Sequence, residues 1–160
     1  MIFIILGSQK FQFNRLLKAV DLQVVQNKIN DEIFAQIGAS DYKPKNYNYK
    51  NFLNRDEFLE HISKADIVIA HGGTGAIVGA LKQGKKVIAV PRLKKYGEHV
   101  DDHQLQLVRE FNNLGLICMC SDCDQIWKTI EIVKFSEYKK YKSNTNSIID
   151  SIEKFIRDEL

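Results

Sequence analysis

The sequence has few cysteines, little net charge and no long apolar run. Three cysteines in 160 residues are an odd number, which does not suggest a disulfide framework, so we expect free thiols and a reducing compartment. A formal net charge of +3 is too small to predict a nucleic-acid partner. No run approaches the roughly 18 apolar residues of a membrane span, and the apolar start at residues 2–6 lacks the basic leader of a signal peptide. We therefore expect a cytoplasmic chain.

The cysteines lie close together, at positions 118, 120 and 123. This spacing can supply three thiolates to a metal ion, but no second Cys or His pair at finger-like spacing completes a tetrahedral set. We expect no metal site from them. Cys118 and Cys120 are instead expected to share one face of a short strand.

Strand-like and helix-like segments alternate along the chain, whose composition of 44% hydrophobic and 27% charged residues is typical of a soluble globular domain. Strands are predicted at residues 2–6, 32–37, 47–52, 66–70, 86–91 and 116–120, and helices at residues 13–25, 55–65, 75–83, 102–113 and 124–135. Strands separated by helices require right-handed crossovers. The fold class is therefore α/β, a Rossmann-like parallel sheet with helices on both faces.

The apolar strand at 66–70 runs directly into a glycine-rich turn, His71-Gly72-Gly73-Thr74-Gly75-Ala76, which opens a helix. Glycines let a ligand approach the backbone, and the free N–H groups and dipole of a first helical turn favour an anion. A tight strand-to-helix turn also requires glycine for steric reasons alone. His71, at the tip of the strand, either donates to a phosphate oxygen or is a satisfied structural group. The segment predicts a phosphate site.

Two further polar loops follow predicted strands, at residues 7–10 and 92–104. The second holds three cations, three carboxylates and two histidines, a composition that also suits a solvated connection. Because the carboxyl ends of parallel strands lie along one edge of a sheet, we expect both loops to meet the 71–76 turn there. Three polar loops on one rim predict a binding crevice.

The segments GSQ at 7–9, HGGTGA at 71–76 and PRLKKYGEHVDDHQ at 91–104 resemble the PssE-type exopolysaccharide glycosyltransferases. These are similar to the C-terminal domain of family-28 glycosyltransferases such as MurG. The resemblance implies the donor-binding half of a GT-B enzyme, in which two Rossmann-like domains face a cleft. The acceptor half would be a separate membrane-anchored polypeptide, as for the soluble subunit of the eukaryotic two-subunit transferase that makes dolichol-linked chitobiose, a GlcNAc transferase.

The resemblance implies an inverting hexosyltransferase. With a membrane-anchored, acceptor-binding partner subunit, it would move a hexose from a UDP-sugar to a polyprenyl-diphosphate-linked saccharide in exopolysaccharide or capsule biosynthesis. Neither a metal nor another cofactor is expected, and the partner would recruit the chain to the inner face of the cell membrane. Two alternatives stay open: a nucleotide-sugar-binding or regulatory subunit without turnover, and an unrelated flavodoxin-like binding domain.

The family pattern also implies roles for single residues. It places the 7–9 loop near the donor diphosphate, the 71–75 loop around the phosphates, and Gln104 at the hydroxyls of the donor sugar. The catalytic base is unknown, with His99 and Glu98 as candidates. Gly79 stands where relatives commonly carry an acidic residue that holds the ribose. The implied substrate-binding residues are Gly7, Ser8, Gln9, His71, Gly72, Gly73, Thr74, Gly75, Arg92, Glu98, His99, Asp102 and Gln104.

Residues 1–135 are expected to form the nucleotide-sugar-binding domain, and residues 136–160 a linker and an amphipathic helix. The linker at 138–146 is basic and polar, which suits either a solvated segment or an approach to anionic lipid headgroups. The helix packs on the parent sheet or docks the partner subunit. Its apolar stripe consists of Ile148, Ile149, Ile152, Phe155 and Ile156.

Overall fold

The computed structural model describes residues 1–144, 149–150, 153–154 and 157. Its centre is a parallel sheet with the strand order β3-β2-β1-β4-β5-β6. The strands are β1 (Ile2–Ile5), β2 (Ile33–Gln36), β3 (Asn48–Lys50), β4 (Ile67–His71), β5 (Lys86–Val90) and β6 (Cys118–Met119). The helices are α1 (Asn14–Val25), α2 (Arg55–Lys64), α3 (Thr74–Lys82), α4 (His103–Asn113) and α5 (Ile126–Phe135), with short 3-10 turns η1 (Lys94–Tyr96) and η2 (Cys123–Gln125).

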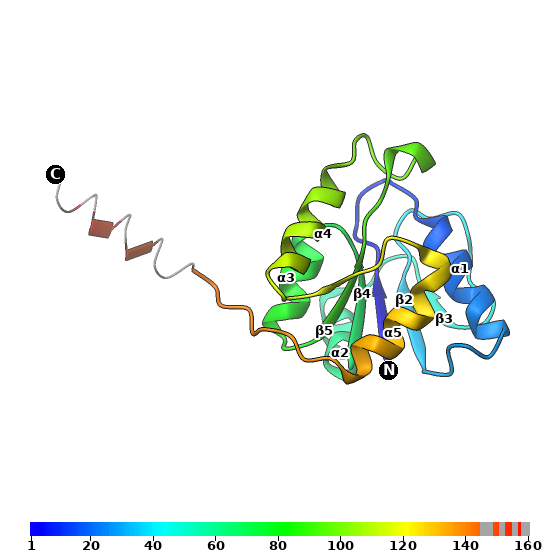
Figure 1. Ribbon diagram of the computed structural model, residues 1–160. Helices are drawn as coiled ribbons and strands as arrows, with labels where there is room; N and C mark the ends of the chain where they lie inside the picture. Colours follow the sequence, from blue (N-terminus) through cyan, green and yellow to red (C-terminus); the bar gives the residue numbers. More distant parts are fainter. Residues whose placement is uncertain (145–148, 151–152, 155–156, 158–160) are drawn as a thin grey trace.

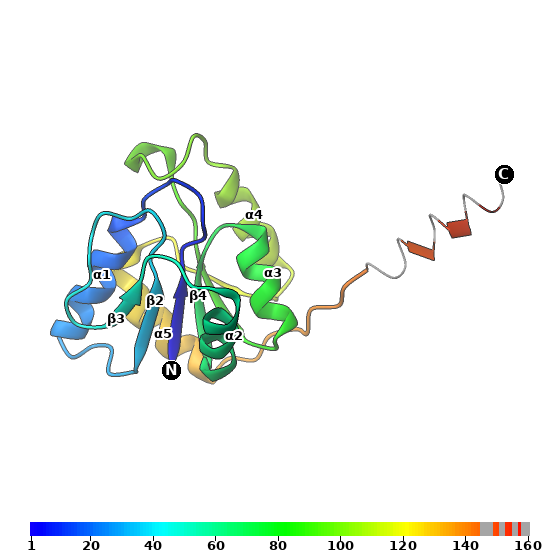
Figure 2. The same ribbon diagram turned by 180° about the vertical axis from the view of Figure 1, so that it is seen from behind.

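Helices cover both faces of the sheet, as the alternating pattern predicts. Helices α1 and α5 lie on one face (Figure 1), and α2 and α3 lie on the other (Figure 2), where α4 joins them through the buried Val108. Every side chain of β1 is buried: Ile2 and Ile4 pack toward α1 and α5, while Phe3 and Ile5 pack toward the opposite face. A strand buried on both faces is apolar throughout, which explains its continuous hydrophobic run.

The strand order reverses beside β1. The chain places β2 and β3 on one side of β1, then crosses back so that β4, β5 and β6 extend the other side. In the register between β1 and β4, Ile5 lies opposite Ala70, so the loops after these two strands leave the sheet side by side. Ligands of open parallel sheets bind outside the carboxyl ends of the strands at such a reversal. The topology therefore directs attention to the upper edge of the sheet in Figure 1.

The last strand is shorter than expected. Only Cys118 and Met119 pair with β5, whereas the apolar pattern predicted a strand over residues 116–120. β6 is an edge strand with one neighbour, so fewer hydrogen bonds define its ends. Cys118 and Cys120 do pack into the same apolar cluster, and all three cysteines are free thiols, as predicted.

The predicted C-terminal stripe lies mostly outside the described residues, since Ile148, Ile152, Phe155 and Ile156 are not among them. Within the linker, Lys139 N–H donates to the Gly115 carbonyl at 2.9 Å. Tyr138 packs against the cluster under α1 and α5, and Tyr141 against the opposite one. None of the described helices has the length and apolar character that a membrane span needs.

The central strands should dominate the stability of the sheet. Ile69 of β4 is fully buried, so Ile69→Ala is expected to lower the free energy of unfolding by about 3 kcal/mol through lost burial and an unfilled cavity. Leu59→Ala on α2 is the control, because 45% of Leu59 is already exposed. Urea unfolding measures both variants, and equal losses would contradict this description of the core.

Candidate functional site

A hollow of about 610 Å³ lies at the carboxyl ends of β1 and β4, where the three polar loops converge. The first loop lines the hollow with residues from position 7 onward, and the second with the turn that follows β4. The third loop lines it with His99 and with the first residues of α4. Nine of the thirteen residues implied by the family pattern line it: Gly7, Ser8, Gln9, His71, Gly73, Thr74, Gly75, His99 and Gln104. The expected crevice at one rim of the sheet is therefore present.

A larger hollow of about 750 Å³ lies elsewhere, between the end of α3, the start of β5 and residues 136–141. It is lined by lysines, among them Lys82, Lys85 and Lys86, and by none of the residues that the sequence implicated. Since β5 begins at Lys86, this hollow is at the opposite edge of the sheet from the loops that follow the strands. The smaller hollow is the candidate site.

The His71 ring is packed between two glycines. A Cβ atom added at Gly7 would lie 2.7 Å from His71 Cε1, and one added at Gly73 would lie 2.3 Å from His71 Nε2. Gly7 also has a φ of +74°, which L side chains rarely adopt. Both glycines are therefore required by the imidazole between them, and the ring is held at the floor of the hollow.

Hydrogen bonding sets the tautomer of His71. Its Nδ1 lies 3.2 Å from the Ile5 carbonyl oxygen, which can only accept, so Nδ1 carries the proton and donates. Burial, with smaller contributions from the charges of Arg92 and His99, lowers the pKa of His71 to about 4. The ring is consequently neutral at pH 7, and its Nε2 is an acceptor. Donation from Nε2 to a phosphate oxygen requires the ring to take up a second proton.

The first turn of α3 offers backbone donors beside this ring. The helix begins at Thr74 after Gly73, with no side-chain cap and no acidic residue in the first turn. Among the described residues, the N–H groups of Thr74, Gly75 and Ala76 have no protein acceptor, whereas the next, Ile77 N–H, donates to the Gly73 carbonyl. Free N–H groups at the positive end of a helix favour an anion. All three of these residues line the hollow.

Gly72 serves packing instead. A Cβ atom there would lie 2.6 Å from Gln104 Cβ, so the glycine lets α4 approach the turn after β4. Gly72 is therefore required for steric reasons, which is one of the two explanations that the sequence allows for the glycines of this turn. Gln104 is 3% exposed, and its Oε1 accepts from Arg92 N–H at 3.2 Å. The side-chain NH₂ of Gln104 is the part of that amide not used by this bond.

The remaining implied residues do not line the hollow: Arg92 and Glu98 are buried beside it, and Asp102 is exposed. The Arg92 side chain is buried, and its Nη2 donates to the carbonyls of Leu6 and Phe11 at 2.8 and 3.0 Å. Burial lowers the pKa of Arg92 to about 10, so the guanidinium is still charged at pH 7. The Asp102 carboxylate accepts from Lys94 N–H at 2.8 Å. These side chains shape the loop after β5 and do not line the hollow.

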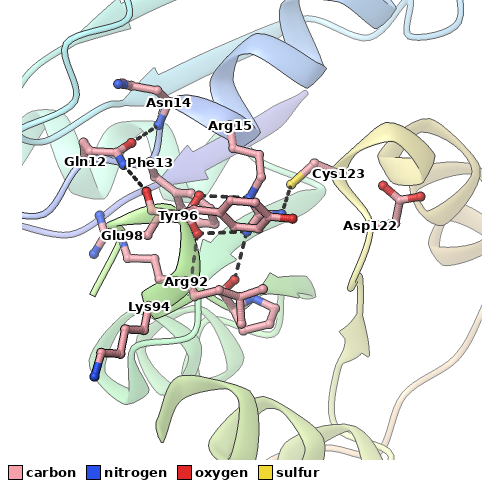
Figure 3. A network of polar contacts seen from close by, with 12 residues as sticks. Gln12, Phe13, Asn14, Arg15, Arg92, Lys94, Tyr96, Glu98, Asp122 and Cys123 are labelled. Atoms are coloured by element: carbon pink, nitrogen blue, oxygen red, sulfur yellow. Dashed lines mark hydrogen bonds and ion pairs between the residues drawn. The ribbon is translucent and has the colours of Figure 1, made fainter. Parts of the chain in front are cut away.

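Glu98, a candidate base, lies in a buried ion pair (Figure 3). Its side chain has no exposed surface, and Arg15 on α1 donates to both carboxylate oxygens, from Nε and Nη2, at 2.9 Å each. Leu93 N–H also donates to Glu98 Oε2 at 2.9 Å, and Arg15 Nη1 contacts the thiol of Cys123. Both carboxylate oxygens are occupied, so Glu98 anchors the loop to α1. Its carboxylate does not reach the hollow.

Sequence reasoning missed several residues of the lining. Gln36 ends the second strand and Phe58 comes from α2, so the hollow extends beyond the three loops. Gln36 was within reach of the same rule that found the loops, because it stands at the carboxyl end of a predicted strand. His103 and Leu107, on α4, complete the opposite side. Whether these two side chains reach the hollow depends on how α4 packs on the sheet, which no local sequence pattern indicates.

Removing the buried carboxylate should destabilise the domain. Glu98→Gln leaves Arg15 beside a neutral amide, and we expect the free energy of unfolding to fall by about 3 kcal/mol. Glu60→Gln is the control, because Glu60 pairs with Lys64 at the surface, where ion pairs contribute little. Urea unfolding compares the two, and a Glu98→Gln variant as stable as the parent would refute the anchoring role.

The pKa of His71 predicts a dependence of stability on pH. It is about 4 in the folded chain and about 6.5 unfolded, so between these values the unfolded state binds more protons. The contribution of neutral His71 to the free energy of unfolding is complete above pH 6.5 and is lost as the pH falls toward 4. We expect about 2 kcal/mol less stability from this group at pH 5 than at pH 7. His71→Gln should flatten that slope in urea unfolding, and an unchanged slope would contradict the assignment.

The chain is similar in sequence or in fold to several known proteins. Residues 1–158 match the family described as the glycosyltransferase family 28 C-terminal domain. The UDP-N-acetylglucosamine transferase subunit ALG13 of Homo sapiens is 27% identical over 127 residues, covering 75% of this chain and 11% of that protein. Its counterpart in Candida glabrata is 30% identical over 102 residues, covering 63% and 48%. The chain thus spans about a tenth and about half of these two relatives.

Solved structures agree on the fold. The chain superimposes on Acinetobacter baumannii MurG with a TM-score of 0.56 and 18% identity, covering 82% of this chain and 41% of that one. For the kitacinnamycin glycosyltransferase the TM-score is 0.64 at 18% identity, with 84% and 35% covered. The parallel sheet, its helices and the sequence match place the chain in the glycosyltransferase family 28 C-terminal domain family, as the Rossmann-like C-terminal half of a GT-B fold.

Proposed function

We propose that this chain is the catalytic, UDP-sugar-binding subunit of a two-component inverting glycosyltransferase. It adds a hexose to a polyprenyl-diphosphate-linked saccharide in exopolysaccharide or capsule biosynthesis. A membrane-anchored subunit binds the acceptor and recruits this cytoplasmic chain to the inner face of the cell membrane. The observation that carries the proposal is the convergence of the Gly7 loop, His71 and the open first turn of α3 on one hollow of a family-28 domain.

The donor diphosphate belongs at the first turn of α3. Breaking the bond between sugar and phosphate develops negative charge on the departing UDP, and fixed N–H donors lower the barrier because they need no rearrangement. The N–H groups of Thr74, Gly75 and Ala76 are such donors. His71 joins them after taking a proton at Nε2, which the bound anion favours by raising the pKa of the ring.

The donor sugar belongs at the α4 side of the hollow. Gln104 presents its amide NH₂ there, held in orientation because its Oε1 accepts from Arg92 N–H. A sugar hydroxyl is the natural acceptor for that NH₂ group. Gly79 offers no carboxylate to the ribose, so recognition of the nucleoside relies on other groups.

The two-component arrangement draws support from the relatives, each of which is named as a subunit of a UDP-N-acetylglucosamine transferase. The described residues form one Rossmann-like sheet, whereas a GT-B site lies between two such domains. The base that removes the acceptor proton is then supplied from the acceptor half or by His99. Glu98 is unsuited to that role because both of its oxygens are occupied by Arg15 and Leu93.

UDP binding tests the site directly. We expect Gly73→Ala to weaken UDP binding about tenfold or more, a loss of about 1.4 kcal/mol, because the added methyl displaces the His71 ring. Gly79→Ala on the same helix is the matched control, since nothing lies within 4 Å of its added Cβ. Isothermal titration calorimetry measures both. If the parent releases no heat with UDP, or if both variants bind equally, the site is misplaced.

Turnover distinguishes the catalytic subunit from a regulatory one. Coexpressed with its membrane-anchored partner, the chain is expected to transfer hexose from a UDP-sugar to a lipid-linked acceptor. Gln104→Ala should abolish transfer while UDP binding and the far-UV circular dichroism spectrum are retained. Full transfer by the Gln104→Ala complex would support the regulatory alternative instead.

A further inference from the structure

Three side chains gather where the loop after β5 enters α4. One ligand atom each from His99, Asp101 and His103 lies within 4.8 Å of the other two. His103 Nδ1 contacts Asp101 Oδ1, and His99 Nδ1 lies 3.4 Å from the same oxygen. His103 N–H also donates to that oxygen at 3.1 Å, which holds the carboxylate between the two rings.

His99 has a buried nitrogen without a hydrogen-bond partner. Its side chain is only 8% exposed, and Nδ1 makes no hydrogen bond to any described residue, since the Asp101 oxygen at 3.4 Å is not aligned for one. The ring is held in place by Phe11, whose centroid lies 4.6 Å away, and by the edge of His103 at 4.7 Å. Buried polar atoms normally have a partner, so an unpaired nitrogen within 4.8 Å of two further ligand atoms indicates a missing one.

We propose that His99, Asp101 and His103 bind a divalent transition-metal ion of the Zn²⁺ class. Two imidazoles and one carboxylate are a ligand set that such ions accept. Zinc–ligand bonds of about 2.0–2.1 Å place tetrahedral ligand atoms roughly 3.3 Å apart. The 3.4 Å between His99 Nδ1 and Asp101 Oδ1 already matches that spacing. His103 is half exposed and needs only to move outward from its contact with Asp101.

An ion bound to this trio would lie at the wall of the candidate hollow. His99 and His103 both line it, so an ion between them adds positive charge to the wall that faces the open turn of α3. Three protein ligands leave a fourth position for water or an anionic oxygen. This metal site differs from the expectation of a metal-free chain, which the cysteine spacing and the family resemblance supported. The proposal of a metal site does not rest on the transferase function, but a metal-bound His99 is not available as the catalytic base, which the acceptor half then supplies.

Zinc titration of the full chain, without nucleotide, tests the site. After chelator treatment, calorimetry is expected to give one Zn²⁺ per chain. Asp101→Asn and His103→Ala should each weaken binding about 100-fold or more. Both side chains are about half exposed, so we expect the variants to fold, and far-UV circular dichroism verifies that they do. Asp102→Asn is the matched control, because the neighbouring carboxylate contacts Lys94 N–H and is not part of the trio.

Cobalt separates this site from the cysteines. Co²⁺ bound to the trio is expected to give visible ligand-field bands without thiolate charge-transfer absorption, and Asp101→Asn should remove them. Absence of Zn²⁺ binding up to millimolar concentration would overturn the proposal. So would binding that Asp101→Asn and His103→Ala leave unchanged, or Co²⁺ spectra with thiolate absorption. None of these results bears on UDP affinity, so the proposed function would fail or stand separately.

Discussion

The site depends on one tightly packed imidazole, that of His71. His71 ends β4, donates to the carbonyl at the end of β1 and fills the space between Gly7 and Gly73, so a single ring joins the two loops at the reversal of strand order. Because the ring is buried and neutral at pH 7, its Nε2 is an acceptor, and this nitrogen becomes a donor only when the ring takes up a second proton. In the proposed function, a diphosphate is favoured through the coupling between ligand charge and the protonation of this side chain.

A second set of buried charges supports that ring from behind. Arg92 donates to the carbonyls of Leu6 and Phe11 beneath the first loop, and Arg15 holds Glu98 beneath the third. The positive charge of Arg92 adds to burial in lowering the pKa of His71. The same charge attracts an anionic ligand. The residues that stabilise the loops are therefore the same ones that favour phosphate in the proposed function.

Much of this could be predicted from the sequence, because the physics involved is local. Apolar runs such as residues 66–70 are typical of strands buried on both faces, and the convergence of loops at the carboxyl edge of a parallel sheet predicts residues 7–9 and 71–75 at one rim. The family pattern added Gln104, which does line the hollow. These features depend on neighbours along the chain or on the general geometry of parallel sheets.

The remainder depends on contacts between distant segments. Glu98 carries the same charge whether it faces solvent or Arg15, which is 83 positions away, and only the packing of α1 decides between them. Gly72 and Gly73 are adjacent in the sequence, yet one accommodates α4 and the other the His71 ring. His99, Asp101 and His103 have the two-residue spacing of a strand, but the segment forms no strand, so their meeting depends on the loop between η1 and the start of α4.

Proton uptake on ligand binding tests the central claim most directly. A UDP-hexose carries a diphosphate that does not titrate near neutral pH, so protons taken up from the buffer on binding are bound by the protein. Calorimetry at neutral pH in two buffers of different ionisation enthalpy should reveal uptake by the parent chain and its absence in His71→Gln. Binding without proton uptake, or uptake that persists in His71→Gln, would contradict the account of an imidazole that becomes a phosphate donor only when the anion is bound.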